Sequence, residues 1–513
     1  MRFRIAIWNV QTDNLPNGPL TSRTKEMQMP NSPRRSYLNL EVRTARQSSS
    51  PSDENQLRIL VSGDFGGQSR SVRQSGQNAE SVRVDFDNFD SVLARFGPSV
   101  DFGTGKDDSL TLRFQSLEDF HPDKLLVNFQ PLLELVELRE RLLHPATSSA
   151  ASTKAKELLQ LPSASSEPPT TMPAQPAGQI FDQLLGKPVS DGAYRASKRS
   201  RVDHLIEQIL GTPSDTVAGE DPKAIRTALE AEISKRLRET LHHHAFQALE
   251  ANWRGLDFLV RNLAENAILR VVDLSKSELS AFLVNGGFDD TPITSLLTAF
   301  RPALILGVYS FGPEDHRMLS AIAQTCETHQ TSFVGGARPE LAGWKSFESQ
   351  AGHIGGASIP ETEGVVALRK RPEANHVGLI LPRFLLRQAY GIRSDPIETF
   401  PFEELDPAPE HESHLWGNPA FLCGHLMSQN FAESGWDFDA GQGGEISGLP
   451  VQRIVSDDGV DTKPCAEAWL SETTEEAIRS RGIIPVLSVR GRDAVRITSL
   501  QSISYPLQNL AIH

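Results

Sequence analysis

Alternation of apolar and polar positions predicts strands in the first third of the chain. Leu57–Val61 is a mostly apolar run, and residues 82–86 and 110–114 alternate apolar with polar side chains. Successive side chains of a strand point to opposite faces, so we expect three strands here. Pro131 then opens a helix, because proline suits the first helical turn and apolar residues recur every three or four positions after it. The pattern over 55–145 predicts a small α/β module.

Helical spacing dominates the next folded part of the sequence. A long helical stretch is predicted from Pro222 to about Asn262, and Trp253 lies on its apolar face. Apolar runs at Ala303–Val308 and Val377–Leu381 then alternate with helical patterns and read as buried strands. We expect a larger α/β domain over 222–513. The fold class is therefore α/β (α+β), with mixed sheets flanked by helices.

Three segments lack the apolar periodicity of a packed fold. Residues 1–54 are rich in Ser, Arg, Asn, Gln and Pro, and we expect a disordered arm there. Residues 146–178 are rich in Ser, Ala, Pro and Thr, which predicts a linker because little apolar area is available to offset the entropy of ordering. Residues 179–221 are expected to form a helical segment and a connection.

Composition and charge exclude several classes of protein. The 513 residues are enough for about two to four domains. The net charge of -14 argues against nucleic acid as a partner, since phosphate binding requires a surplus of Lys and Arg. Apolar runs stop far short of the roughly 20 residues that a membrane helix needs, so we expect no membrane partner. Three cysteines without a C-x-x-C spacing indicate neither a zinc knuckle nor a disulfide framework, and a cytoplasmic location is expected.

Two groups of histidines are candidate metal ligands. His411 and His414 flank Glu412 at a spacing of three, whereas zinc proteases place two histidines four apart on one helical face. We expect a solvated loop there. The triple His242–His244 is expected inside the long helix, where consecutive side chains diverge by about 100° and do not converge on one ion. We therefore predict that the chain has no metal ligands.

Sequence patterns of catalysis are incomplete. Ser310 follows a predicted strand, but its surroundings do not match the G-x-S-x-G of a nucleophile elbow. Gly63, Gly66 and Gly67 follow another strand without the Gly-Lys-Ser/Thr of a phosphate loop. Acidic residues near Gly441 lack the spacing of a calcium loop. We expect no catalytic and no cofactor-binding residue, and the alternative is an α/β hydrolase or metal-dependent enzyme built on Ser310 or on the His411/His414 pair.

Several blocks of sequence resemble one known family. The helical block at 241–256, the block His376–Gly391 with Phe402–Glu404, and the block Leu415–Ala420 resemble the large contractile-sheath subunit of type VI secretion systems, the TssC/VipB (ImpC/EvpB) family. Gly448–Pro450, Lys463–Glu467 and Gly482–Pro485 match it in the same order. Residues 84–90 and 112–143 are similar to the small sheath subunit, TssB/VipA. The resemblance thus implies small-subunit and large-subunit elements fused in one chain.

The resemblance implies a structural protein that is not an enzyme. Its implied partners are other sheath subunits, an Hcp-like inner tube protein, baseplate components and the ClpV AAA+ ATPase. Large sheath subunits continue beyond the position equivalent to Pro485, so the large-subunit domain is expected to be shortened at its C-terminus. That difference puts normal polymerisation in doubt and leaves an accessory homologue, which caps, nucleates or limits the sheath, as an alternative.

A short stripe after the predicted linker is the one candidate binding site. Ile180, Phe181, Leu184 and Leu185 fall on one side of a helix. The stripe resembles the N-terminal helix through which ClpV recognises large sheath subunits. A helix docked on the protein's own core is the alternative.

Overall fold

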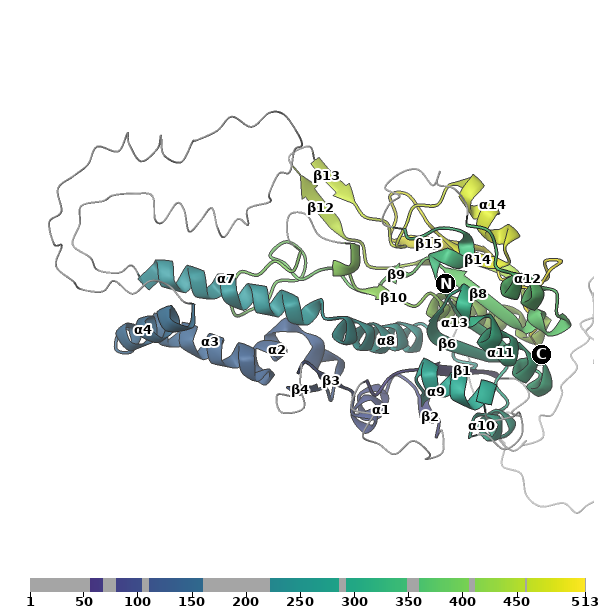
Figure 1. Ribbon diagram of the computed structural model, residues 1–513, viewed down its shortest axis with the longest axis horizontal. Coiled ribbons are helices and arrows are strands. Elements are labelled where there is room, and N and C mark those ends of the chain that lie inside the picture. The colour runs from purple at the N-terminus through teal and green to yellow at the C-terminus, as the bar shows by residue number, and fades with distance from the viewer. Residues whose placement is uncertain are drawn as a thin grey trace, which may run out of the picture. The chain divides into compact units, whose positions relative to one another are not determined.

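The computed structural model describes residues 56–67, 80–103, 110–159, 222–285, 292–347, 359–405, 411–456 and 459–512. Within these residues, nine strands form one sheet in the order β11-β15-β14-β8-β7-β6-β1-β5-β2 (Figure 1). The strands are β1 (Leu57–Gly63), β2 (Val82–Val84), β5 (Ala267–Asp273), β6 (Leu304–Phe311), β7 (Ser332–Ala337), β8 (Val377–Leu381), β11 (Gln442–Ser447), β14 (Ile483–Ser488) and β15 (Ala494–Ser499).

The middle of this sheet is parallel and its margins are antiparallel. β5, β1, β6, β7, β8 and β14 run parallel to one another, whereas β2 pairs antiparallel with β5, and β15 pairs antiparallel with β14 and β11. Parallel strands need crossover connections, and helices supply most of them here. The predicted strands Leu57–Val61, Ala303–Val308 and Val377–Leu381 are confirmed as β1, β6 and β8.

Helices cover both faces of the sheet, so alternate strand residues enter two separate cores. α8 (His244–Arg261) and α13 (Ala420–Ser434) pack on the face that carries Val61, Leu306 and Ile380. The other face is covered by α9 (Lys276–Ser280), α10 (Pro292–Phe300), α11 (His316–His329), α12 (Glu363–Arg369) and α14 (Glu472–Ser480). α8 and α13 approach closely at Gly255, where an added Cβ would lie 2.2 Å from the Phe421 ring. The expected class, α/β with a mixed sheet flanked by helices, is confirmed.

The residues expected to form a small α/β module contribute β1 and β2 to the large sheet. β1 lies in the middle of the large sheet, bonded to β5 on one side and β6 on the other. The remaining elements of this part are α1 (Phe89–Phe96), the β3 (Ser99–Asp101) and β4 (Thr111–Arg113) pair, α2 (Pro122–Asn128) and α3 (Gln130–Leu143). A strand buried on both faces and bonded on both edges is part of the common core, because its apolar side chains are covered by the rest of the chain.

The structure differs from the predicted linker at its start. Residues Ser148–Leu158 form a helix, α4, which packs against α3 and α7 (Pro222–Leu241). The Ser- and Ala-rich composition suggested a linker, but Ala151 and Ala155 lie four positions apart on one helical face and are small enough to bury against the neighbouring helices. Residues 160–221, with the rest of the linker and the 179–221 connection, lie outside the described residues, as does the arm before residue 56.

The predicted long helix is two helices. α7 ends at Leu241 and α8 begins at His244, with His243 extended at the junction at φ -65° and ψ 125°. The triple histidine therefore marks a break, and the prediction that it lies inside one helix was wrong. Two small sheets complete the fold: β9 (Phe384–Leu385) pairs with β10 (Trp416–Gly417), and β12 (Arg453–Ser456) forms a hairpin with β13 (Gly459–Thr462) (Figure 1). None of the described helices combines the length and apolarity that a membrane span requires.

Candidate functional site

The junction between residues 56–159, here the first segment, and residues 222–512, here the second segment, is the most extensive functional candidate. β1 of the first segment pairs with β5 from Leu57↔Ala267 to Gly63↔Asp273, and with β6 from Ile59↔Leu304 onward. Each pairing is parallel, so β1 occupies a position that only a strand of this direction and register fills. The two segments therefore share one sheet and one core.

Trp253 anchors the junction on the α8 face of the sheet. Its indole is fully buried, and Nε1 donates a hydrogen bond to the Phe65 carbonyl oxygen at 3.0 Å. The rings of Phe65, Phe89 and Phe96 surround the indole at centroid distances of 5.2, 5.9 and 5.9 Å. Edge contacts between aromatic rings add to the area that they bury. The expectation that Trp253 is a core residue is confirmed.

A second aromatic cluster joins the segments at the start of α8. Phe114 and Phe120 of the first segment stack with their centroids 4.0 Å apart. The Phe246 ring meets both of them edge-on, at 5.8 and 5.7 Å. All three rings are buried. Because α8 carries both Phe246 and Trp253, one helix of the second segment fixes the first segment at two places.

A buried ionic network lies on the same helix. The Arg387 guanidinium donates to Glu250 at 2.9 Å and to Glu404 at 2.7 Å, and Arg254 Nε donates to Glu250 at 2.7 Å. Glu250 and Glu404 are almost completely buried. Burial opposes ionisation of Glu404, but the Arg387 charge and its hydrogen bonds hold the pKa of that carboxyl at about 2. Burial raises the pKa of the nearby Tyr390 phenol to about 12. Glu404 is thus charged and pairs with Arg387, and Arg387 also donates to Glu250, which ties α8 to the segment that follows β9.

The segment after β9 also contacts the first segment directly. The Tyr390 ring meets His121 edge-on at 5.0 Å. The Asp123 carboxylate accepts hydrogen bonds from the Glu398 amide and the Thr399 hydroxyl at 3.1 and 3.0 Å. The ionic network therefore supports a third contact between the segments. Sequence reasoning missed this network, although Glu250 and Arg254 interrupting an apolar helical face at a spacing of four gave a signal for it.

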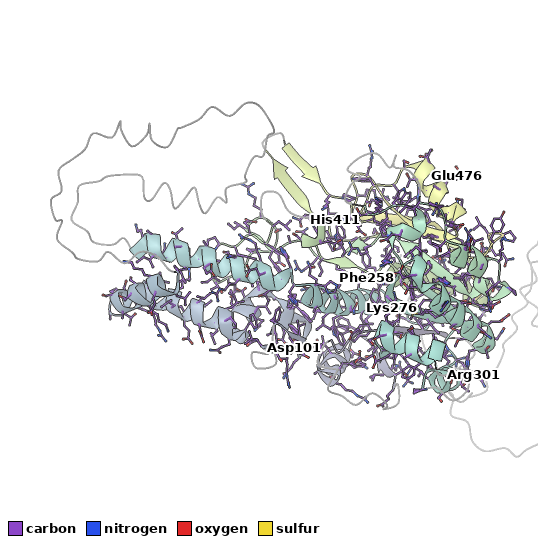
Figure 2. All side chains as sticks on the ribbon, in the orientation of Figure 1. Asp101, Phe258, Lys276, Arg301, His411 and Glu476 are labelled. Atoms are coloured by element: carbon purple, nitrogen blue, oxygen red, sulfur yellow. The ribbon has the colours of Figure 1, made fainter. Side chains whose placement is uncertain are left out.

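His411, labelled in Figure 2, belongs to a separate ionic cluster. Its Nε2 lies 3.0 Å from Glu467 Oε1, and Glu412 completes three groups whose ligand atoms lie within 4.8 Å of one another. The Arg383 guanidinium donates to both carboxylates at 2.6 Å. A metal ion at these carboxylates would face that positive charge at close range, so the donor set fits an ion-pair cluster better than a metal centre.

His414 does not join His411 in one ligand set. Its ring stacks at 5.7 Å from Trp416, and Nδ1 lies 3.4 Å from Lys463 Nζ. The prediction of a solvated loop was wrong at this residue, since His414 is 4% exposed. Burial and the Lys463 charge lower the pKa of His414 to about 4, so the imidazole is neutral at ordinary pH.

The other sequence candidates have structural roles in the described residues. Ser310 lies within β6, and its carbonyl oxygen accepts from Lys276 Nζ at 2.8 Å. The Gly66 amide donates to Asp273 Oδ1 at 3.0 Å, and a Cβ on Gly66 would lie 2.6 Å from that carboxylate, so a close approach requires glycine there. The candidate residues Ile180, Phe181, Leu184 and Leu185 lie outside the described residues.

Comparison with known proteins assigns both segments. The family model VipB (EvpB), tail sheath N-terminal domain, matches residues 223–290 and 301–504, which is more than half of the chain. The chain belongs to the VipB tail sheath family. A second model, VipA of the type VI secretion system, matches residues 31–165 and so includes the whole first segment. The VipB match falls on the second segment, so the junction described above is where a VipA match and a VipB match meet.

A curated relative agrees with the VipB assignment. The type VI secretion system sheath protein TssC1 of Pseudomonas aeruginosa (strain PAO1) is 28% identical over 338 residues. The alignment covers 62% of this chain and 68% of TssC1. The expected resemblance to the large and small sheath subunits is confirmed by these matches. The VipB family is one of structural sheath proteins.

Proposed function

We propose that this chain is a structural subunit of the contractile sheath of a type VI secretion system, in which one polypeptide supplies both the VipA and the VipB parts. The observation that carries this function is the place of β1, a strand from the VipA match, between β5 and β6 of the VipB match. A sheet completed in this way joins the VipA and VipB parts within one chain.

The covalent connection fixes the ratio of the two parts at one to one. Two segments on one chain meet at an effective concentration set by the connection between them, whereas separate subunits meet at their cellular concentration. We propose that the protomer then acts without catalytic chemistry. Its partners are further copies of the chain, an Hcp-like inner tube, baseplate components and the ClpV ATPase, in the cytoplasm of the bacterium.

Electron microscopy of the purified full-length chain tests this function. The chain is examined alone and together with an Hcp-like inner tube protein, and sedimentation measures the fraction assembled. Hollow helical tubules are the expected result. Persistent monomers in both samples would overturn the proposal and favour an accessory role. A mock sample of the tube protein alone controls for tubes that form without the sheath.

A further inference from the structure

A polar pocket opens where α12, the end of α14 and the segment at Tyr505 meet. Its volume is about 410 Å3, within the range of roughly 300 to 1,000 Å3 that binding pockets occupy. Arg369 forms its base. The residue is 5% exposed, and its guanidinium donates to Glu361 at 2.5 Å, to Ser480 O at 2.9 Å and to Ile503 O at 3.1 Å. A buried arginine held by three acceptors gives the pocket a fixed shape.

The pocket combines positive charge with an aromatic wall. Arg369, Lys370 and Arg481 line it against the single carboxylate of Glu361, so its net charge is +2 in a chain whose net charge is -14. Tyr505 also lines the pocket and is 63% exposed, and the Arg369 guanidinium lies 5.7 Å from the centre of the Tyr505 ring. The chemistry that suits such a pocket is an aromatic ring flanked by carboxylates, because the ring packs on Tyr505 while the carboxylates meet Lys370 and Arg481.

The chain itself displays a group of that kind. Phe86 is 64% exposed, the highest value among the large apolar side chains of the described residues, and Asp85 and Asp87 flank it. Its turn is held rigid, since the Asp85 amide donates to Asn88 Oδ1 at 3.0 Å and the Asn88 amide returns a bond to Asp85 Oδ1 at 3.1 Å. Arg261 lies 5.3 Å from the Phe86 ring and leaves most of the side chain in solvent.

Phe86 and the pocket are too far apart to meet within one copy. Phe86 follows β2 at one edge of the sheet, whereas Lys370 and Arg481 precede β8 and β14. β2 and β8 are separated by five strand spacings, which at about 4.8 Å each amounts to about 24 Å. Val84 pairs with Leu269 near the start of β5, so the Phe86 turn and the pocket lie at the same end of the parallel strands.

We propose that Phe86 of one copy inserts between Lys370 and Tyr505 in the pocket of a neighbouring copy. This contact rests on the proposed function, because it requires copies to assemble. The two surfaces differ, so the contact is heterologous and repeats from copy to copy, and such contacts build rings or open helices. Asp87 meets Lys370 across the contact, and the carboxylates orient the ring through charge.

Cysteine cross-linking between two kinds of copy tests the contact. One full-length chain carries Arg83→Cys, at a side chain that is 66% exposed and lies three residues before Phe86, and another carries Ser480→Cys. A short bis-maleimide is added to each chain alone and to their mixture. Ser480 lines the pocket and is exposed, so the substitution leaves Phe86 and the pocket charges in place. The three native cysteines are buried, and burial raises their thiol pKa values, so they react slowly.

A cross-linked dimer is expected in the mixture and not in either chain alone. Absence of the dimer from mixed tubules would overturn the contact while the sheath function stands. A dimer without tubules would support the contact and count against the sheath function. Absence of both the dimer and the tubules would overturn both proposals. The matched control pairs Ser480→Cys with Val127→Cys, which is 60% exposed on α2, and an equal yield from this pair would show collisional cross-linking and overturn the contact.

Charge reversal tests the same contact through assembly. Phe86→Ser should raise the concentration of half-assembly at least about tenfold, since aromatic anchors dominate such contacts. Asp87→Lys and Lys370→Glu should each weaken assembly. Mixing the two variants should restore it, because both alternating contacts then join opposite charges, one as the native pair and one as the reversed pair. Assembly unchanged by all three substitutions, with melting temperatures equal to the parent, would refute the proposal.

Discussion

The indole nitrogen of Trp253 donates its hydrogen bond to Phe65 across 188 positions of sequence. Phe65 follows β1 in the VipA match, whereas Trp253 lies on α8 in the VipB match. The amides of Phe65 and Gly66 donate in turn to Asp273 at the end of β5. One short turn of the first segment is therefore fixed by both a helix and a strand of the second segment.

Trp253→Ala should lower the free energy of unfolding by about 3 to 5 kcal/mol, because it leaves a cavity among three phenyl rings and removes a buried hydrogen bond. Denaturant unfolding followed by circular dichroism measures the change. Phe86→Ala is the control, since that side chain is 64% exposed and its loss should change stability by about 0.5 kcal/mol or less. Equal effects of the two substitutions would place Trp253 outside the core.

Glu404→Gln should destabilise the protein by about 3 to 5 kcal/mol, because it removes a buried charge that pairs with Arg387 and leaves that guanidinium partly uncompensated. Glu137→Gln removes one partner of an exposed ion pair with Arg141, and about 1 kcal/mol or less is expected. Thermal and denaturant unfolding of both variants measure the change in the free energy of unfolding. A small effect at Glu404 would show that the network does not hold the segment after β9.

Stability should fall as the pH is lowered from about 6.5 to about 4. The pKa of His414 is about 4 in the folded protein and about 6.5 in the unfolded chain, so the unfolded state binds the proton first and gains from acid. This pKa difference corresponds to about 3 kcal/mol, fully present above pH 6.5. His414→Phe should flatten the dependence in this window. The Glu404 contribution is lost only below its ordinary pKa of about 4.5, so it does not account for a change at pH 6.

A protease site introduced between residues 160 and 221 should yield two fragments that stay together. β1 is bonded to β5 and β6, and three aromatic or ionic contacts add to it, so separation would expose a large apolar surface. Size-exclusion chromatography after cleavage measures the association. Fragments that elute apart without denaturant would contradict the shared core. The uncleaved parent with inactive protease is the control.

A peptide of residues 176–190 should bind the N-terminal domain of a cognate ClpV ATPase with an affinity of roughly 1 μM, about 8 kcal/mol. Phe181 and Leu185 are the proposed anchors of a helix in an apolar groove. Fluorescence anisotropy compares the parent peptide with a Phe181→Ser, Leu185→Ser double variant, which should not bind. Equal binding, or none by either peptide, would remove the ATPase as a partner at this site.

Apolar periodicity and the position of proline predicted those strands and helices that depend mainly on neighbouring residues in the sequence. The strands at Leu57–Val61 and Val377–Leu381 and the helix after Pro131 follow from periodicity and from proline at a helix start. Burial of Trp253 also followed from its place on an apolar helical face. The break at His243 was missed because nothing in the neighbouring residues forbids a helix, and the extended conformation arises from packing, where His243 meets the Phe102 ring at 4.8 Å.

Long-range pairing could not be read from the pattern of one segment. The alternation around β1 fits a strand in a small module as well as a central strand, and only its pairing with residues 267–273 and 304–307 decides between them. The ionic network was hidden for the same reason, because Arg387 and Glu404 lie more than 130 positions from Glu250. Ala151 and Ala155 show that small residues in a polar segment bury when other helices approach them.

During synthesis, β1 is made long before the two strands that flank it in the sheet. Its first partner strand begins 210 positions later, at Ala267, and Leu304, the first β6 residue paired with it, lies 245 positions after Ile59. At a translation rate of about 5 to 20 residues per second, the nascent strand waits on the order of 10 to 50 s before both neighbours have been made. During that interval an apolar strand with two unpaired edges can pair with other chains. Ribosome-bound chaperones should therefore stay bound to this polypeptide for longer than to one whose neighbouring strands are made in succession.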